Sequence, residues 1–333
     1  MSTYAPYRRG SRDPLRGARG RRSSPGEWRW SDRLALAAAW GTGLLLCVIA
    51  GAIVIYMAFR GVQYLRPAML VEHTNPSISQ AESGGFLDPI EGTALLTLIG
   101  LAFVFPLAVC TALWVVEYGR PNWLARIVES AIEIVAGTPD IVLAVFGLAL
   151  FQLPFMSVFS LKAQGGGVFG RSFIAAGAML SLIALPPLFA ATRDGLLSVP
   201  SHMREAAYAL GKTKIATIRS VLLPSVRSNI AAGVTLGVSR IIGDTAIIVV
   251  LVDSLRVESG SGGPVLSLFK GTGPTLTSYV YDNSPAGEGG APQKAYAAAF
   301  VLMLLVLGLN LLVSRFGRSS ADETGLTAAG AVV

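Results

Sequence analysis

The feature that most constrains this chain is a run of 26 residues, Leu34–Phe59, that holds no charged side chain. As a helix rising ~1.5 Å per residue it would extend about 39 Å, enough to cross a hydrocarbon core of roughly 30 Å with some tilt. Five later stretches are also mainly apolar and of similar length: about Thr93–Val116, Ile127–Leu153, Ser172–Ala191, Ile230–Val252 and Ala295–Val313. The sequence therefore predicts an all-α, polytopic membrane protein with six transmembrane helices.

The composition agrees with a membrane protein. Only 14% of the 333 residues are charged, whereas a typical soluble domain has about 25%. Both cysteines, Cys47 and Cys110, lie in apolar runs, where a thiol behaves as a small hydrophobic group. The two histidines, His73 and His202, fall in loops that we place on opposite sides of the membrane. We therefore expect no disulfide framework, no metal site and no cofactor.

Residues 1–33 contain nine arginines and no lysine, with proline, glycine and serine between them. Such a segment cannot bury a core, so we expect a disordered, basic cytoplasmic tail that helps to set the orientation and binds anionic lipid. Nucleic-acid binding is not needed to explain the charge. The expected divisions of the remaining chain are a first transmembrane helix at 34–59, an external loop at 60–92, a membrane core at 93–313 and a cytoplasmic tail at 314–333.

The distribution of basic residues predicts the orientation. With the N-terminus inside, the inner segments hold 19 of the 27 lysines and arginines and the outer loops hold seven, while Arg240 lies within a span. Because inner loops carry the excess of basic residues, both termini and residues 201–224 are expected on the cytoplasmic side.

Residues 201–224 are polar but have helical spacing of apolar side chains. Ser201 is a candidate cap for a short helix that Gly211 would end, and Thr213 for a second helix that reaches Pro224. Two short helices that meet at a glycine between membrane spans predict a docking surface. Gly211-Lys212-Thr213 looks like the end of a phosphate-binding loop, but Ala206 stands where that motif requires glycine, so we expect no nucleotide binding and no enzymatic activity in this chain.

Two charged residues, Arg240 and Asp244, are expected deep in the fifth span, where an ionised side chain costs about 2.5–3.5 kcal/mol on insertion scales. They are four residues apart and would share one helix face. One interpretation is a structural ion pair. The other is that Arg240 faces an anion pathway while Asp244 positions it, and both can hold in different conformational states.

Three acidic residues, Glu129, Glu133 and Asp140, would form one stripe along the third span if its helix were continuous. Gly137-Thr138-Pro139 makes that continuity doubtful. We expect these acids to pair with Arg126, Arg193 or Arg240. Alternatively, a broken helix at this point would expose backbone groups to a cavity.

The polar loop carries a recognisable motif. Glu205-Ala206-Ala207, then Gly211 after three intervening residues, and Val221-Leu222-Leu223-Pro224 after nine more resemble the EAA loop of the permeases of ABC importers. In that family the loop contacts a cytoplasmic ATPase and passes its motion to the membrane helices. The resemblance implies an ATPase-coupling role for Arg204, Glu205, Ala206, Ala207, Gly211, Leu223 and Pro224.

Further motifs between residues 84 and 313 resemble the phosphate-uptake permeases. They are Gly84-Gly85-Phe86 through Gly92-Thr93, Pro106 to Val109, Glu117-Tyr118, Ala131 to Pro139, Phe146 to Ala149, Leu196 to Pro200, Ser239-Arg240 with Gly243 to Ala246, and Thr275 to Thr277. The chain is most similar to the A-type subunit of that family. The resemblance implies a type I ABC importer permease fold with a cytoplasmic coupling-helix loop in a bacterial plasma membrane. It also implies three kinds of partner: a homologous C-type permease, an ATPase dimer and an external phosphate-binding protein.

The resemblance places the substrate pathway at Arg240, Asp244, Thr245 and Arg193. The chain departs from the family at Asp244, which replaces a glutamate, at Ala190, where many members have arginine, and at Asp140, which replaces a small polar residue. Phosphate is the expected substrate. Transport of another small oxyanion, such as molybdate or sulfate, is one open alternative. The other is that the protein is an ion-coupled secondary carrier, which the acidic stripe favours and the EAA-type loop opposes.

The charge distribution makes a direct prediction. A reporter fused after Val313 is expected in the cytoplasm, and one inserted near Gly262 is expected outside, because the basic residues flank the inner ends of the spans. Accessibility of the two fusions to a membrane-impermeant reagent measures this. The reverse pattern would contradict both the orientation and a cytoplasmic position for residues 201–224.

Overall fold

The computed structural model describes residues 30–74, 84–119, 121–159, 163–164, 167–252, 269–285, 287 and 290–329. It divides into two compact units, residues 1–56 and 57–333. The described part of the first unit is the greater part of one long helix, which continues into the second unit. The predicted tail up to residue 29 and the loop position Gly262 lie outside the described residues.

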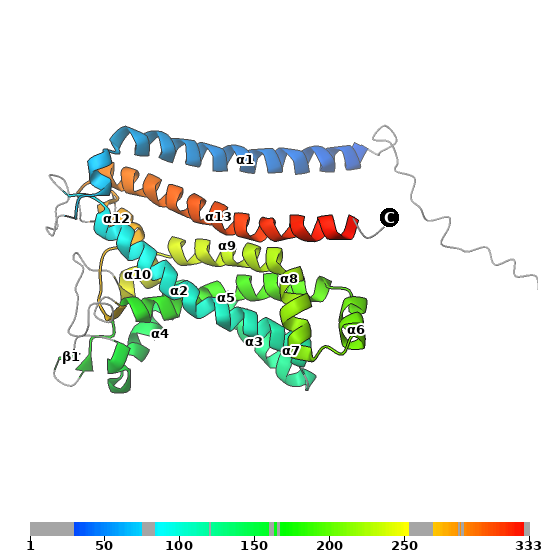
Figure 1. The fold of residues 1–333 in the computed structure, drawn as a ribbon. Coiled ribbons are helices and arrows are strands. Elements are labelled where there is room, and N and C mark those ends of the chain that lie inside the picture. The colour runs from blue at the N-terminus through cyan, green and yellow to red at the C-terminus, as the bar shows by residue number, and fades with distance from the viewer. Residues whose placement is uncertain are drawn as a thin grey trace, which may run out of the picture. The chain divides into compact units, whose positions relative to one another are not determined.

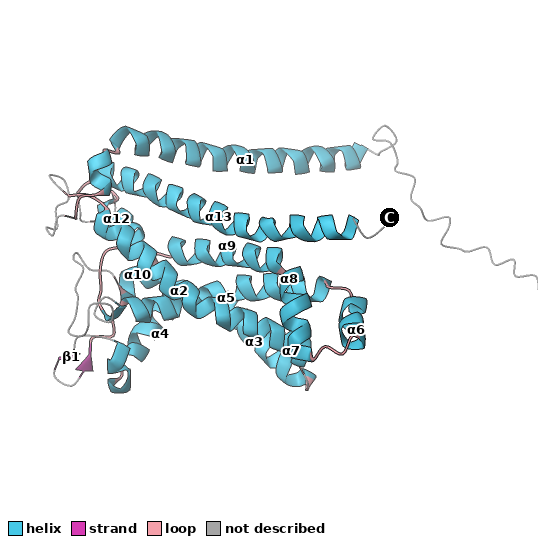
Figure 2. Ribbon diagram, viewed as in Figure 1, coloured by secondary structure: helices cyan, strands magenta, loops and turns pink. Residues whose placement is uncertain are grey.

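Helices make up nearly all of the described chain (Figure 2). The principal helices are α1 (Trp30–Tyr64), α2 (Leu87–Leu113), α3 (Asn122–Gly137), α4 (Asp140–Phe151), α5 (Phe173–Ser198), α9 (Arg227–Gly243) and α13 (Pro292–Ala329). Short helices are α6 (Ser201–Ala209), α7 (Lys214–Thr217), α8 (Leu223–Ser225), α10 (Ala246–Leu251) and α12 (Leu276–Asn283), with 3-10 turns at Pro67–Leu70 and Pro154–Phe159. Two-residue strands β1 (Ala163–Gln164) and β2 (Gly167–Val168) pair antiparallel. The all-α fold class expected from the sequence is confirmed.

The described helices include four that are long and apolar enough to cross a membrane alone: α1, α2 extended by a π-helical turn at Trp114–Tyr118, α5, and residues 292–315 of α13. Two further spans result if each of two bent helix pairs is one span, and this gives the predicted six. The first pair is α3 with α4, bent by 105°, and the second is Lys214–Ser225 with α9, bent by 69°.

Two of the predicted spans are broken, the third at the Gly137-Thr138-Pro139 position that made its continuity doubtful and the fifth at a point where no break is predicted. The third span ends its first helix at Gly137 and restarts at Asp140. Thr138 is extended at ψ 131° because the residue before a proline avoids the helical region. The fifth span breaks after Gly243, where Asp244 is extended and its carboxylate accepts a 2.7 Å hydrogen bond from the backbone N–H of Ile247. An aspartate that bonds nearby backbone in this way competes with the helix.

The core of the unit formed by residues 57–333 is built around α5, which packs against α2 on one side and α9 on another. In Figure 1, α9 lies between α5 and α13. Glycines permit these close approaches, since a methyl group on Gly233 of α9 would stand 2.8 Å from Leu188 of α5. Ser239 of α9 and Asn310 of α13 share a 3.0 Å hydrogen bond. Packing is thus the role of the small residues in the fifth span.

The two ends of this unit differ. The helices α6 and α7 lie at one end, and α12 with the beginning of α13 lies at the other (Figure 1). At the α12 end, the backbone N–H of Leu276 donates a 2.8 Å hydrogen bond to Thr93 of α2. Outside the spans at this end, His73 Nδ1 lies 2.8 Å from Asp88 Oδ1, and this hydrogen bond raises the pKa of the imidazole. The end of α2 that carries Asp88 is therefore held by local polar contacts.

Candidate functional site

The polar loop forms a corner between two short helices, and its geometry explains the glycine. Gly211 has a φ of +76°, a left-handed backbone that glycine adopts without strain. Its N–H donates to the Tyr208 carbonyl at 2.9 Å, and the N–H of Lys212 donates to the Ala207 carbonyl at 3.1 Å. This pattern is a Schellman motif, which satisfies the last carbonyls of α6. The expectation that Gly211 ends the first helix is confirmed.

The caps of the two short helices are only partly as expected. Thr213 caps the second helix, since its hydroxyl accepts from the Ala216 N–H at 3.3 Å. That helix continues from α7 through a π-helical turn, Ile218–Leu222, into α8, which contains Leu223 and Pro224. The cap expected at Ser201 is wrong, because Pro200 occupies that position and Ser201 is the first helical residue.

The tip of the corner is apolar and exposed. Leu210 is 80% exposed and Ile215 is 71% exposed, while Glu205 and Ala206 are also on the surface. Ala207, by contrast, is buried on the inner side of α6. A methyl group placed on Gly211 would meet nothing within 4 Å. Exposed leucine and isoleucine on a polar loop form a patch that fits a partner.

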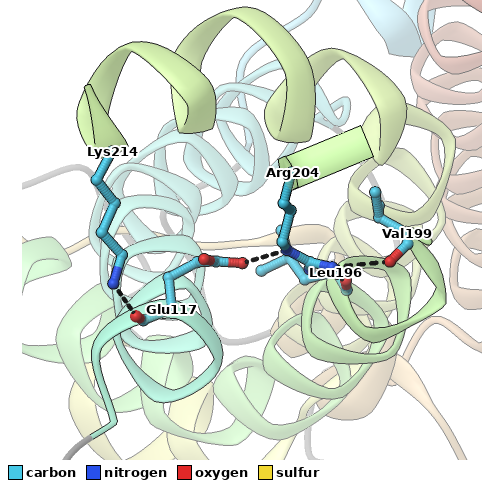
Figure 3. Close-up of polar contacts among 5 residues, drawn as sticks. All are labelled: Glu117, Leu196, Val199, Arg204 and Lys214. Atoms are coloured by element: carbon cyan, nitrogen blue, oxygen red, sulfur yellow. Dashed lines mark hydrogen bonds and ion pairs between the residues drawn. The ribbon is translucent and has the colours of Figure 1, made fainter. Parts of the chain in front are cut away.

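A set of polar contacts fixes the corner to the membrane helices (Figure 3). Arg204 of α6 donates from Nε to Glu117 Oε1 at 3.0 Å, and its two terminal nitrogens donate to the carbonyls of Leu196 and Val199, each at 2.8 Å. Lys214 of α7 donates to the backbone carbonyl of Glu117. We call this set the Glu117 clamp. It joins both short helices to the end of the second span and to the end of α5.

The Glu117 clamp is well shielded from water, since the Glu117 side chain is 7% exposed and that of Arg204 is 21% exposed. The Lys214 ammonium also lies 4.1 Å from the centre of the Tyr118 ring, a cation–π contact. Removing one partner of such a shielded pair leaves a charge without compensation, so the pair acts as a mechanical unit. Reasoning from the sequence singled out Arg204 but not Glu117 or Lys214 as contacts. The signals in the sequence were a glutamate at the very end of an apolar stretch and the Glu117-Tyr118 motif, neither of which indicates the contacting residue.

The second candidate site lies where the two broken spans meet. The helix α4 packs on α10, and Arg240 near the end of α9 reaches Asp140, the first residue of α4. One terminal nitrogen of Arg240 lies 3.2 Å from Oδ1 and 3.3 Å from Oδ2 of Asp140. Of the two interpretations, the structural ion pair of Arg240 with Asp244 is not seen in this structure, because Arg240 pairs with Asp140 instead. The helix ends at Gly243, so the four-residue spacing no longer places the two side chains on one face.

Two cavities flank this ion pair. The first, of ≈ 330 Å³, is lined by Val135, Ala136, Ile183, Pro186, Pro187 and Leu236 in addition to the pair. The second, of ≈ 400 Å³, is lined by Ser239, Gly243, Asp244, Thr245 and Ala246 in addition to the pair. Asp140 and Arg240 are the residues that the two linings share. Irregular backbone at a helix break beside a cavity is the arrangement that membrane depth tolerates.

The other predicted site residues lie apart from these cavities. Arg193 of α5 pairs with Glu129 of α3 at 2.7 Å and lies in neither lining. The single acidic stripe is wrong, because the break after Gly137 separates Asp140 from the two glutamates. The expected pairing of acids with arginines is confirmed for Glu129 and Asp140, whereas Glu133 is exposed. Within the described residues, no group of three or more metal-ligating side chains comes together.

Comparison with known proteins places the chain in a family. The family model described as the binding-protein-dependent transport system inner membrane component matches residues 104–321. The chain belongs to this family. It is thus a membrane-spanning permease component, and the matched range contains the Glu117 clamp, the corner and both broken spans.

Individual relatives agree with the family. The chain is 30% identical over 234 residues to the phosphate transport system permease protein PstA of Mycobacterium leprae, covering 70% of this chain and 71% of that one. It is also 30% identical over 246 residues to the phosphate transport system permease protein PstC of Xylella fastidiosa, covering 70% of each. A solved bacterial alginate ABC transporter contains a chain with a TM-score of 0.59 and 17% identity, covering 87% of this permease and 95% of that chain. The expected type I importer permease fold is confirmed.

Proposed function

We propose that this permease is a membrane-spanning subunit of an ATP-driven importer that moves inorganic phosphate across the bacterial plasma membrane by alternating access. The observation that carries the proposal is Arg240, a guanidinium placed between two cavities at the helix breaks, in a chain similar to phosphate permeases over 70% of its length. A planar guanidinium is always charged and matches the spacing of two oxyanion oxygens.

The corner supports coupling to an ATPase. Its exposed apolar tip is the docking element, and the Glu117 clamp transmits the motion of that element to two spans. Glu205, Ala206, Gly211 and Leu210 form the surface offered to the ATPase, while Arg204 and Ala207 face inward. Leu223 and Pro224 are half-buried at the far end of the second helix and join the corner to α9. This division gives each residue of the loop a distinct role.

The partners in the proposed complex are a second, homologous permease subunit, a dimer of ATPase subunits and an external phosphate-binding protein. The relatives include A-type and C-type subunits at equal identity, so the A-type assignment rests on the motifs quoted for it. The excess of basic residues in the predicted inner segments supports a cytoplasmic position for both termini and the corner. The substrate pathway runs past Arg240, Asp244 and Thr245. Arg193 enters it only in a state in which its pairing with Glu129 is broken.

Two alternatives to phosphate import by an ATP-driven transporter have unequal support. Molybdate or sulfate would satisfy the same guanidinium, so uptake of labelled phosphate in the presence of excess unlabelled sulfate or molybdate separates these anions. An ion-coupled carrier is disfavoured, because an exposed docking corner has no role in a protein without an ATPase partner.

The corner yields a prediction on coupling. Gly211→Val is expected to abolish phosphate-dependent stimulation of ATP hydrolysis and most uptake, because a β-branched residue is strained at a φ of +76°. Gly211→Asn is the matched control, since asparagine tolerates the left-handed region, and it should keep most of the activity. Both variants should insert and assemble. Normal coupling in the valine variant would remove the role of the corner.

A second prediction concerns Arg240 and uses the partner seen in the structure. Arg240→Gln is expected to reduce phosphate uptake at least about tenfold, because hydrogen bonds to charged groups contribute about 1.5–3 kcal/mol each. Arg240→Gln combined with Asp140→Asn removes both charges of the pair. It should stay inactive if the guanidinium contacts phosphate.

The measurement is initial uptake of labelled phosphate into cells that lack other phosphate importers, with expression and assembly matched. Recovery in the double variant would show that Arg240 only neutralises Asp140, and would contradict the contact with phosphate.

A further inference from the structure

The pair of Arg240 and Asp140 is held more loosely than the pairs of Arg193 with Glu129 and of Arg204 with Glu117. Its contacts of 3.2 and 3.3 Å come from one guanidinium nitrogen, whereas charge-assisted pairs are usually about 2.7–2.9 Å long. Arg193 reaches Glu129 at 2.7 Å, and Arg204 is bound through all three of its nitrogens. The Arg240 side chain is 53% exposed and that of Asp140 is 32% exposed. A carboxylate held by longer contacts to a single guanidinium nitrogen is easier to displace than one held by short contacts.

Asp140 has a favourable position when it is not bound to Arg240. It is the first residue of α4, a helix of 12 residues. The first turn of a helix presents backbone N–H groups and the positive end of its dipole, which stabilise a carboxylate. Release of Asp140 from Arg240 therefore leaves its charge compensated locally.

Asp244 does not take the place of Asp140. Its carboxylate accepts the N–H of Ile247 at 2.7 Å and is buried at the break between α9 and α10. Among the described residues, Asp140 is therefore the carboxylate that contacts the Arg240 guanidinium. A negatively charged substrate that binds Arg240 has to displace it.

We infer that Asp140 is a displaceable counter-anion that occupies Arg240 in place of the substrate and so closes the passage between the two cavities until a phosphate-like oxyanion replaces it. This inference rests on the proposed function and adds a gating and specificity-determining residue to it. Asp140 and Arg240 are common to the linings of both cavities, so the pair lies where the two spaces approach each other. An oxyanion that engages two guanidinium nitrogens displaces a carboxylate held by one. The negative charge of Asp140 also repels anions while the pair is closed.

The test uses the complete importer reconstituted in vesicles loaded with labelled inorganic phosphate, without ATP and without the external binding protein. The initial rate of phosphate efflux down its gradient then measures movement through the permease without the contribution of ATP-driven transport. Asp140→Asn is expected to raise efflux about two- to fivefold, the size of effect expected when one weak ion pair stops competing. Asp140→Ser, which also lacks the carboxylate and suits the start of a helix, is a second variant in case the first does not assemble.

Two controls separate a gate from a structural role. Asp140→Glu keeps the charge and should hold efflux near that of the unaltered importer. Glu91→Gln removes an exposed acidic charge at the beginning of α2 and should also leave efflux unchanged. Equal efflux in Asp140→Asn, Asp140→Ser and Glu91→Gln would overturn the gate, as would a leak in Asp140→Glu as large as that in Asp140→Asn. ATP-driven phosphate uptake by the unaltered importer is measured alongside, and its absence would refute the proposed function instead.

Discussion

Two membrane-spanning helices of this permease break at neighbouring points. The ion pair of Arg240 with Asp140 links the two breaks. The constraint is electrostatic, because the Arg240 side chain lies within a span and an ionised side chain there needs a counter-charge. The nearest carboxylate in sequence, Asp244, is used to begin α10, so the counter-charge comes from a different span. That choice links α4 to α9 at the point where the two cavities approach each other.

The helix α5 connects this pair to the corner. Its middle residues Ile183, Pro186 and Pro187 line one cavity, and its final carbonyls at Leu196 and Val199 accept hydrogen bonds from Arg204. In the proposed coupling, displacement of the corner moves a wall of the cavity through α5, and the Glu117 clamp adds the end of the second span to this movement. Because the clamp is shielded from water and has shorter contacts than the Arg240–Asp140 pair, the second pair is the one expected to open.

The sequence predicted the features that depend on local chemistry. The lengths of the apolar runs predicted the membrane spans. Gly211 predicted the end of a helix, because few residues other than glycine adopt its left-handed backbone conformation. Predictions that assumed a continuous helix were wrong, as with the spacing of Arg240 and Asp244. The partner of Arg240 depends on the 105° bend between α3 and α4, and residue spacing does not encode the direction of a bend. Glu117 was overlooked as a contact for a similar reason, since only tertiary packing brings the end of a span against α6.

The most direct test of this account is a pair of high-resolution structures of the assembled importer, one without nucleotide and one trapped with bound ATP and phosphate. The account predicts that Arg204 stays within hydrogen-bonding distance of Glu117 in both states, while Arg240 leaves Asp140 and contacts an oxyanion in the trapped state. An intact pair of Arg240 with Asp140 in the phosphate-bound state, or a clamp that opens while that pair stays closed, would contradict it.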